Sequence, residues 1–333
     1  MSVGSHKGRQ MMKPWNSQKI RTRRPAVKSR ISTIYVLGDL NLDIVLSGLE
    51  VLPSFGEERL ATGCSMKPGG SAANVAIMLS INACPVRLFA QIGNDQAGEF
   101  LMQSIETYGI DTKTISSSTQ EATGLTVSLT FPEDRMYITY PGSVRTTSLK
   151  QLVNRYIEQY AHLHLTSYFL QTSLKKDIGE VLRKATAAGM STSLDPGGDT
   201  EGHWDISELK GYLSYVDYFM PNSDEICAMT GRKDVKAAIR VFPKEARVVI
   251  VKAGAHGALT RYNGEIEAHQ AVPVNPVDST CAGDCFDAGF LYGLYGGDTF
   301  QGAIQKGLQF GAQAVSSLGL PSVKIEHFLK EHI

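Results

Sequence analysis

The chain has 333 residues, of which 42% are hydrophobic and 20% are charged, enough for one large α/β domain or two ordinary ones. Its formal net charge is zero, but residues 31–333 carry 24 basic against 33 acidic side chains, which argues against nucleic acid as the main ligand. The sequence contains no run of about 18 apolar residues, so no membrane-spanning helix is predicted. The five cysteines form no CxxC pair, so we expect reduced thiols in a cytoplasmic protein.

The first 30 residues differ from the rest. They contain nine Lys or Arg and no Asp or Glu, and they lack the apolar residues that a folded core needs. We therefore expect residues 1–30 to be a disordered basic extension and residues 31–333 to form the folded domain. The extension has no apolar stretch of the kind that secretory signals contain. Its sequence is compatible with an upstream leader and with an arm for targeting or nucleic-acid binding.

The first half of the folded domain begins with an apolar run, Ile34–Leu37, that predicts a buried strand. Residues 44–66 have the character of extended segments with polar interruptions. The elements expected next are a helix over Ser71–Ser80, a strand over Val86–Gln91, and a helix over Ala97–Tyr108 that ends at Gly109.

Residues 124–140 show a different pattern. Leu125–Phe131 alternates apolar and polar side chains, a turn follows at Pro132–Arg135, and Met136–Tyr140 runs back. This predicts a hairpin with one exposed face. Together with residues 44–66, the hairpin predicts a small sheet separate from the main one.

The second half alternates strand-like and helix-like segments. Such units with short links predict a mostly parallel sheet with helices on both faces, and ligands then bind beyond the carboxyl ends of the strands. The expected segments are a helix over Leu149–Gln159, a strand over His162–Thr166, a helix over Leu174–Ala188, strands over Ser191–Leu194 and Val216–Met220, a helix over Ser223–Thr230, a strand over Val248–Lys252, and helices over Cys281–Tyr295 and Phe300–Leu318.

The segment Asp278–Gly293 is the most informative, because small residues stand where a loop becomes a helix. Ala282 and Gly283 let backbone N–H groups approach a ligand closely, and a helix start offers unpaired N–H groups and a positive dipole end. These features suit a phosphate group. Asp284 lies in the same first turn, where a carboxylate can accept a proton from an incoming hydroxyl. The plainer interpretation makes Asp284 a helix N-cap beside a glycine turn.

This segment resembles the C-terminal signature of the ribokinase-like (PfkB-type) family of carbohydrate and nucleoside kinases. The matching residues are Asp278, Thr280, Ala282, Gly283, Asp284 and Phe286. Cys281 departs from the Gly or Ala that is usual there. The resemblance implies a ribokinase-like three-layer α/β/α fold, ATP and Mg²⁺ as cofactors, Asp284 as the catalytic base, and the backbone of Cys281–Asp284 as an anion hole.

The resemblance extends over roughly residues 33–325, because further motifs match in the same order. Gly38–Asp43 follows the first strand, as the family's opening motif does. Asn41 and Asp43 then correspond to residues that bind substrate hydroxyls. Without the resemblance, Asp43 would be interpreted as a solvated loop acid.

Residues Gly69-Gly-Ser-Ala-Ala-Asn74 resemble the family's N-terminal signature. The resemblance implies that Gly69 and Gly70 let a substrate lie against backbone and that Asn74 belongs to the substrate site. The alternative is an ordinary glycine-rich turn. Some ribokinases have Lys where this chain has Ser71, which leaves the identity of the sugar open.

On the nucleotide side, Asn222-Ser-Asp-Glu225 resembles the family's Asn-Xaa-Xaa-Glu motif. The resemblance implies that Asn222 binds near the nucleotide and that Glu225 organises Mg²⁺, through water, as suits an ion that keeps several waters. The same residues also read as a helix cap, and both interpretations can hold at once.

Two further nucleotide contacts are implied by the resemblance. Lys252, Gly254 and Gly257 match a glycine loop on the nucleotide side, although a tight turn between strands explains them equally simply. Gln313 lies where family members often have a polar residue that contacts the nucleotide.

Four remaining positions are candidates at strand ends or in the signature loop. Gln171 occupies a position on the substrate side, and Asp195 is either a polar site residue or a turn former. Asp278 and Thr280 match a loop that binds a monovalent cation in some relatives, which raises the hypothesis of a K⁺ site.

In the family, a small β-sheet covers the sugar, and segments 44–66 and 124–140 fit that lid. Closing such a lid excludes water, which would otherwise compete as phosphoryl acceptor. Tyr137, Tyr140 and Arg145 are candidates to reach the substrate from it. Related lids pair into homodimers, so we expect a homodimer, with a monomer whose hairpin faces solvent as the alternative.

The function that the resemblance implies is transfer of phosphate from ATP to a hydroxyl of a small sugar. The alternatives are a nucleoside kinase on the same fold and a non-catalytic sugar-binding regulator. Neither GxGxxG nor GxxxxGK[ST] occurs, which excludes the usual dinucleotide and P-loop sites, and no His spacing predicts zinc. The acceptor stays open among sugars, sugar acids, phosphorylated sugars and nucleosides.

Overall fold

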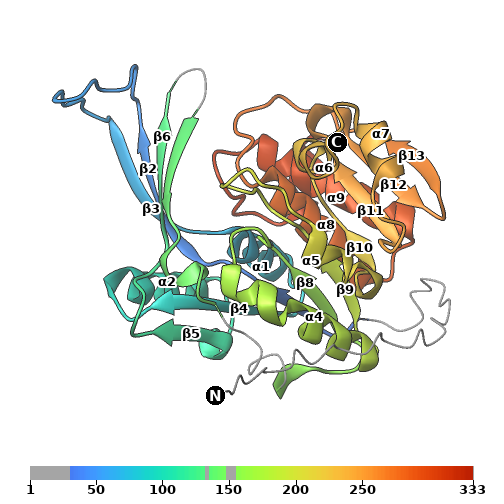
Figure 1. Cartoon of the computed structure of the whole chain (residues 1–333). Coiled ribbons are helices and arrows are strands. Elements are labelled where there is room, and N and C mark those ends of the chain that lie inside the picture. Colours follow the sequence, from blue (N-terminus) through green and yellow to red (C-terminus); the bar gives the residue numbers. More distant parts are fainter. Residues whose placement is uncertain (1–30, 132–134, 148–154, 333) are drawn as a thin grey trace, which may run out of the picture.

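The computed structural model describes residues 31–131, 135–147 and 155–332 (Figure 1). Within them, one large sheet has the strand order β13-β12-β11-β10-β9-β8-β1-β4-β5 and is parallel except for β12, which runs antiparallel to both neighbours. Its strands are β1 (Ile34–Leu37), β4 (Val86–Gly93), β5 (Ile115–Ser118), β8 (His162–Leu165), β9 (Ser191–Leu194), β10 (Tyr218–Phe219), β11 (Val248–Lys252), β12 (Ala258–Tyr262) and β13 (Glu265–His269).

A second, small sheet projects from the body of the molecule, as Figure 1 shows. Its order is β3-β2-β6-β7, with the β6–β7 hairpin laid parallel to β2 through β6. The strands are β2 (Asn41–Ser47), β3 (Gly63–Gly69), β6 (Leu125–Thr130) and β7 (Arg135–Tyr140). The expected sheet from segments 44–66 and 124–140 is therefore present, but β2 begins earlier than expected, so that Asn41 lies inside it.

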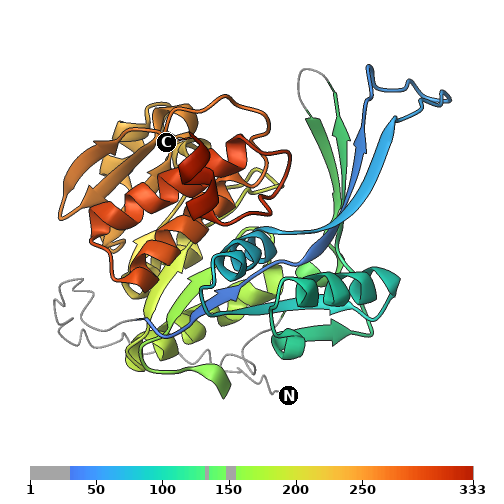
Figure 2. The same cartoon turned by 180° about the vertical axis from the view of Figure 1, so that it is seen from behind.

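Helices cover both faces of the large sheet (Figures 1 and 2). One face is packed by α1 (Ser71–Ile81), α2 (Gln96–Thr107), α8 (Ala282–Gly296), α9 (Phe300–Val315) and α10 (Ile325–His332). The other face is packed by α4 (Thr172–Ala187), α5 (Ser207–Lys210), α6 (Ser223–Thr230) and α7 (Val235–Val241). Short 3₁₀ turns occur at Thr112–Thr114, Gly142–Val144, Leu213–Tyr215 and Gly254–His256. This confirms the predicted three-layer α/β/α fold.

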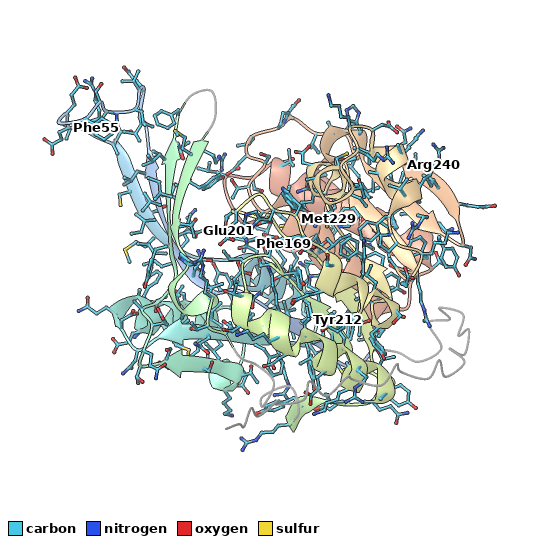
Figure 3. All side chains as sticks on the ribbon, in the orientation of Figure 1. Phe55, Phe169, Glu201, Tyr212, Met229 and Arg240 are labelled. Atoms are coloured by element: carbon cyan, nitrogen blue, oxygen red, sulfur yellow. The ribbon has the colours of Figure 1, made fainter. Side chains whose placement is uncertain are left out.

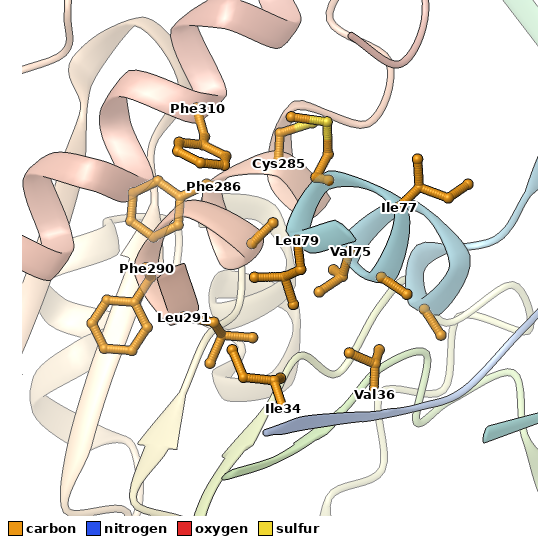
Figure 4. Close-up of a cluster of buried hydrophobic side chains, with 14 of the residues drawn as sticks. Ile34, Val36, Val75, Ile77, Leu79, Cys285, Phe286, Phe290, Leu291 and Phe310 are labelled. Atoms are coloured by element: carbon orange, nitrogen blue, oxygen red, sulfur yellow. The ribbon is translucent and has the colours of Figure 1, made fainter. Parts of the chain in front are cut away.

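The alternation of side chains along β1 explains why the sheet is buried on both faces. Ile34 and Val36 belong to the core on the α1 and α8 side, whereas Tyr35 and Leu37 belong to the core on the α4 side. Figure 4 shows the first pair beneath Val75 of α1. Burying each such side chain contributes about 1.5–3 kcal/mol, so the position of β1 in the sheet is strongly determined.

Glycines hold α8 close to α9, and this fixes where α8 begins. A Cβ at Gly289 would lie 2.5 Å from the carbonyl oxygen of Lys306, and one at Gly293 would lie 2.7 Å from the Cα of Ala303. No larger residue fits at either position without moving one helix, so close backbone contact sets the depth of α8 in its layer.

Several elements were not expected from the sequence, the β12–β13 hairpin among them. Its turn is Asn263-Gly264, and both residues have positive φ, 52° and 85°. An Asn-Gly pair is the strongest short signal for such a hairpin, so this turn was readable in the sequence. β5, α5, α7 and α10 are short or terminal and were also missed. The helix expected over Leu149–Gln159 lies mostly outside the described residues.

None of the helices in the described part of the chain is both long enough and apolar enough to cross a membrane.

Candidate active site

The N-terminus of α8 carries the features expected of an anion site. Cys281 is its N-cap residue, has left-handed backbone geometry (φ 54°, ψ 9°) and gives no side-chain cap. Within the predicted anion hole, Ala282 N–H donates to the carbonyl oxygen of Ser279 at 3.3 Å, so the N–H groups that follow it are the ones left for a ligand. A Cβ on Gly283 would lie 3.6 Å from Lys252 Nζ, so the missing side chain leaves the space above that ammonium open. The site therefore combines helix N–H groups with a nearby positive charge.

Asp284 lies in the first turn of α8 and is held by a residue from the first half of the chain. Its Oδ2 accepts a hydrogen bond from Asn74 Nδ2 at 2.7 Å, across a separation of 210 residues. Burial raises the pKa of Asp284 to about 6, against the opposing effect of the Asn74 hydrogen bond. A carboxylate with this pKa is ionised at neutral pH and still basic enough to accept a proton. Asn74 was predicted to bind substrate; here it orients the predicted base.

The predicted substrate residues Asn41 and Asp43 meet on β2. Asn41 Nδ2 donates to Asp43 Oδ1 at 2.7 Å and lies 3.3 Å from Thr126 Oγ1 on β6. Burial and the charge of Asp39 raise the pKa of Asp43 to about 7. The pair presents an amide and a carboxyl group together, the chemistry that binds neighbouring hydroxyls.

The glycine pair Gly69-Gly70 is required by close packing. A Cβ at Gly69 would fall 2.2 Å from the carboxyl carbon of Asp43, and Gly70, with φ 100°, would place one 2.6 Å from the carbonyl oxygen of Asp39. The space beside Gly69 is thus filled by Asp43. The role expected for the pair, contact between substrate and bare backbone, stays a prediction.

Asp39 was not predicted as a site residue, although it stands inside the motif Gly38–Asp43. Its carboxylate accepts from the backbone N–H groups of Ser71 at 3.1 Å and Ala72 at 3.2 Å, and from Ser167 Oγ at 2.9 Å. It therefore ties the start of α1 to the end of β8. The signal available in the sequence was its place directly after a buried strand.

Gln171 lies deeper than expected. Its side chain is fully buried and its Nε2 donates to the carbonyl oxygen of Thr166 at 2.8 Å, while its Oε1 has no hydrogen-bond partner among the described atoms. Its role as a substrate ligand stays a prediction.

Lys252, expected on the nucleotide side, is directed into a buried cluster of charges. Its Nζ lies 2.7 Å from Asp195 Oδ2 and 3.1 Å from Asp287 Oδ2. Burial would lower the pKa of Lys252, but the two carboxylates and Glu225 raise it, so the ammonium stays charged. The nucleotide contact expected for Lys252 stays a prediction, since the structure shows its ammonium paired with two carboxylates and beside Gly283 of the predicted anion hole.

Asp195 is a turn former, as one of its two interpretations had it, and its role as a site residue stays a prediction. Asp195 Oδ1 accepts from the backbone N–H of Gly197 in a turn, and its Oδ2 pairs with Lys252. Asp287, one turn after Asp284 on α8, was missed by sequence reasoning. Burial raises its pKa well above the usual value, against the effect of Lys252. A charged residue on an apolar helix was the signal.

Two fully buried histidines of β8 lie next to this cluster. His162 and His164 both lie 2.7 Å from Ser193 Oγ, and His164 Nε2 is 3.9 Å from Asp287 Oδ2. Burial lowers the pKa of each imidazole to about 3, so both are neutral at physiological pH. The contact of His164 with Asp287 is therefore not an ion pair, and Lys252 remains the cation of the cluster.

Asn222 and Glu225 form a capping box at the start of α6. Glu225 N–H donates to Asn222 Oδ1 at 2.9 Å and Asn222 N–H donates to Glu225 Oε2 at 2.8 Å. Burial and the charges of Asp195 and Asp284 raise the pKa of Glu225 to about 7, against the opposing effects of Lys252 and the Asn222 hydrogen bond. The helix-cap interpretation thus holds, and it places the Glu225 carboxyl group near the predicted base.

The comparisons with known proteins agree with this geometry. A family model described as pfkB family carbohydrate kinase matches residues 31–325. The chain belongs to this family. It is 27% identical to the ribokinase of Haemophilus influenzae over 299 residues, which is 87% of this chain and 94% of that protein. It is 26% identical to the 2-dehydro-3-deoxygluconokinase of Bacillus subtilis over 264 residues, which is 75% of this chain and 81% of that protein.

The fold is likewise that of solved kinases. The Arabidopsis thaliana ribokinase, complexed with ribose and ATP, superposes with a TM-score of 0.76 at 23% identity, covering 90% of this chain and 98% of that one. This likeness shows the shared fold. The chain is thus a pfkB-family carbohydrate kinase with the ribokinase-like architecture.

In this pfkB-family kinase, the remaining nucleotide-side predictions concern two glycines after β11 and a glutamine of α9. Gly254 and Gly257 form the turn between β11 and β12, as the turn interpretation has it, and a Cβ at Gly257 would fall 2.0 Å from the carbonyl oxygen of His269. Gln313 is buried and donates to the carbonyl oxygen of Val323 at 2.9 Å. Nucleotide contact by these three residues stays a prediction.

A hollow of about 480 Å³ opens beside the signature loop of the kinase. Its wall is partly apolar and partly polar, and none of its residues was singled out from the sequence. The lining residues are Pro273, Val274, Asn275, Val277 and Ser316.

Asp278 and Thr280, the candidate K⁺ ligands, contact an arginine of the small sheet. Asp278 is buried, and its Oδ1 lies 2.8 Å from Arg135 Nη2, while Arg135 Nη1 donates to Thr280 Oγ1. Among the described residues, no group of three or more His, Cys, Asp or Glu side chains is arranged to hold a metal ion.

Proposed function

We propose that the chain transfers the γ-phosphoryl group of Mg-ATP to a hydroxyl of a small sugar, with Asp284 as the base. The observation that carries the proposal is the position of Asp284 in the first turn of α8, with Asn74 on its carboxylate and an N-terminus that no side chain caps. In this proposal, nucleophile activation and anion binding both occur within one helix turn.

The proposed reaction needs one proton acceptor from the chain and forms one bond to phosphorus as another breaks. Asp284 accepts the hydroxyl proton as the sugar oxygen bonds to the γ-phosphorus and the bond from that phosphorus to the β-bridging oxygen breaks, which releases ADP. In the anion hole proposed at Cys281–Asp284, the backbone N–H groups of Gly283 and Asp284 would face the charge that grows on the transferred group, while Ala282 N–H donates to the carbonyl oxygen of Ser279. Lys252, held beneath Gly283 by two carboxylates, adds a fixed positive charge on the same side.

Mg²⁺ would supply charge neutralisation between the phosphates. The donor set fits an ion that binds chiefly to phosphate oxygens and water, because Glu225 is a single buried carboxyl group near Asp284. The capping box fixes Glu225 in orientation before any ion arrives.

The sugar is expected at Asn41 and Asp43, between the small sheet and Asp284. The adenine and ribose of ATP are expected in the hollow beside Val274 and Val277, whose mixed wall suits a purine ring. This arrangement puts the two substrates on opposite sides of the α8 N-terminus.

We also propose that the small sheet acts as a lid and as the contact between two copies of the chain. Its edge strand β7 exposes Tyr137, Ile138 and Tyr140, which are 54%, 66% and 50% exposed. Apolar side chains on an unpaired strand edge are a surface that proteins normally cover. Figure 3 shows Phe55 at the far tip of the same sheet, away from the body.

The test is ADP release from Mg-ATP across sugars, sugar acids, phosphorylated sugars and nucleosides, with Asp284→Asn beside the wild type. Loss of the base is expected to lower kcat by about 10²–10⁴-fold with little change in melting temperature. Asp224→Asn, an exposed acid in the first turn of α6, is the matched control and should retain full activity.

Each outcome selects among the candidate functions. Turnover on one sugar that collapses in Asp284→Asn supports the proposal, and turnover on nucleosides alone would replace it by the nucleoside kinase. A sugar-specific rise in melting temperature without any ADP release would replace it by the sugar-binding regulator.

A further inference from the structure

One contact joins the small sheet directly to the signature loop before α8. Arg135, the first residue of β7, pairs with Asp278, and the two are separated by 143 residues in the chain. The side chain of Arg135 is 21% exposed and that of Asp278 is 4% exposed, so the pair is largely shielded from water. Buried and bidentate arginine contacts of this kind fix geometry far better than exposed pairs do.

The carboxylate of Asp278 is fully engaged in organising its loop. Oδ1 also accepts from Thr280 N–H at 2.6 Å, and Oδ2 accepts from Gly319 N–H at 2.9 Å. Burial alone would raise the pKa of Asp278, but these hydrogen bonds and Arg135 lower it, so the group stays ionised. Asp278 thus fixes the loop both to Gly319, which follows α9, and to Arg135 of the small sheet.

These contacts do not fit a monovalent cation coordinated by the side chains of Asp278 and Thr280. A guanidinium group already lies against Asp278 Oδ1 and Thr280 Oγ1, and a second positive charge at those oxygens would be repelled. The guanidinium is also permanently charged. The side-chain oxygens that suggested a K⁺ site are therefore already bound by Arg135 of the same chain.

Resting on the proposed kinase activity, we propose that Arg135 is a positioning residue with two linked effects. It latches the closed lid onto the signature loop, and it supplies there the positive charge that a bound monovalent cation would otherwise supply. Thr280 directly precedes Cys281, so the latch reaches the anion hole through one peptide unit. Closing the small sheet then also fixes the backbone of the anion hole, and neither change requires K⁺.

The experiment compares the wild type with Arg135→Gln in chloride salts of K⁺, Na⁺ and tetramethylammonium at equal ionic strength. Melting temperature and kcat/KM are both measured, since the first does not need turnover. Arg59→Gln is the matched control, because Arg59 is an exposed arginine of the same small-sheet region that pairs with Glu57 only at the surface. Arg135→Lys keeps the charge and loses the fork geometry.

For the wild type and Arg59→Gln, we expect the same melting temperature and kcat/KM in all three salts. For Arg135→Gln, we expect kcat/KM to fall by roughly 5- to 100-fold, with part of the loss restored by K⁺ and a K⁺-specific rise in melting temperature. Arg135→Lys should lie between the two.

Three results would overturn the proposal. K⁺-specific activation or stabilisation of the wild type would show a separate cation site. Wild-type behaviour of Arg135→Gln would show that the contact is incidental. Loss of activity in Arg135→Gln with no cation response would show that the arginine does not replace a cation. If no substrate is turned over at all, the proposed activity fails, while the melting curves still decide whether K⁺ binds once Arg135 is removed.

Discussion

The two sides of the site are built differently. On the side of the main sheet, Lys252 pairs with the buried carboxylates of Asp195 and Asp287 inside the body of the molecule. On the side of the small sheet, Asn41 and Asp43 lie on a sheet whose outer strand is largely exposed. Because the first side is part of the folding core and the second is not, we expect defects on the first to appear as instability and defects on the second to appear as weak substrate binding.

The largest effect is expected for Lys252→Met, which would leave Asp195 and Asp287 buried without their cation. Removing one partner of a buried charge cluster typically costs about 3–5 kcal/mol, so urea or thermal unfolding should show a large loss. Lys113→Met, which removes an exposed ammonium 3.9 Å from Asp111, should cost less than about 0.5 kcal/mol. Adding Asp287→Asn to Lys252→Met should restore part of the loss. Wild-type stability of Lys252→Met would break the contrast.

The second effect tests the small-sheet side. In Gly69→Ala, the new Cβ would fall 2.2 Å from the Asp43 carboxyl carbon and push that side chain away from the sugar. We expect kcat/KM for the sugar to drop by about 10- to 100-fold through KM, with the KM for ATP unchanged. Gly296→Ala, at a position where nothing lies within 4 Å of a Cβ, is the control. An unfolded Gly69→Ala would mean that this region belongs to the core after all.

The pH dependence of activity tests whether Asp284, which lies between the two sides, is the base. Burial raises its pKa to about 6, so kcat/KM should fall as the pH drops through about 6 and the carboxylate is protonated. The Asn74 hydrogen bond favours the ionised form, so Asn74→Ala should move this acid limb to higher pH. Asn94→Ala, at an exposed position, should leave the profile unchanged. A limb that does not move in Asn74→Ala would separate Asn74 from the base.

A substitution on the exposed edge strand β7 is expected to change the stability of the subunit little but to change its oligomeric state. Ile138→Asp puts a charge at a position that is 66% exposed, and we expect a dimer to become a monomer in sedimentation with little change in the melting temperature of the subunit. Val241→Asp, on the main body and 52% exposed, is the control. A wild-type chain that sediments as a monomer would contradict the proposed dimer.

The sequence predicted the parts of this fold that local pattern determines. β1 and β11 are apolar on both faces, and α6 carries its capping box within four residues, so each was expected within about two residues of its position. The Asn263-Gly264 turn was equally readable and was overlooked. The motif around Asp284 placed the predicted base at the start of a helix, where the structure has it.

Contacts between distant segments could not be predicted in this way. Lys252 was placed on the nucleotide side because its loop matched a motif, but the carboxylates that hold it lie 57 and 35 residues away. Likewise, the guanidinium that meets Asp278 comes from the other sheet. One sequence shows which residues can carry charge, whereas the pairing of those charges depends on how the two sheets meet.

The smallest effect is expected at Cys281, where the two sides join. Its φ of 54° lies in the left-handed region, which costs a residue with a side chain about 1–2 kcal/mol and costs glycine almost nothing. We therefore expect Cys281→Gly to raise the free energy of unfolding by up to about 1 kcal/mol, since glycine also gains entropy in the unfolded chain. Activity should be retained, because the proposed anion hole uses backbone N–H groups rather than the thiol. A loss of activity in Cys281→Gly at unchanged stability would instead assign the thiol a direct part in binding the transferred phosphate.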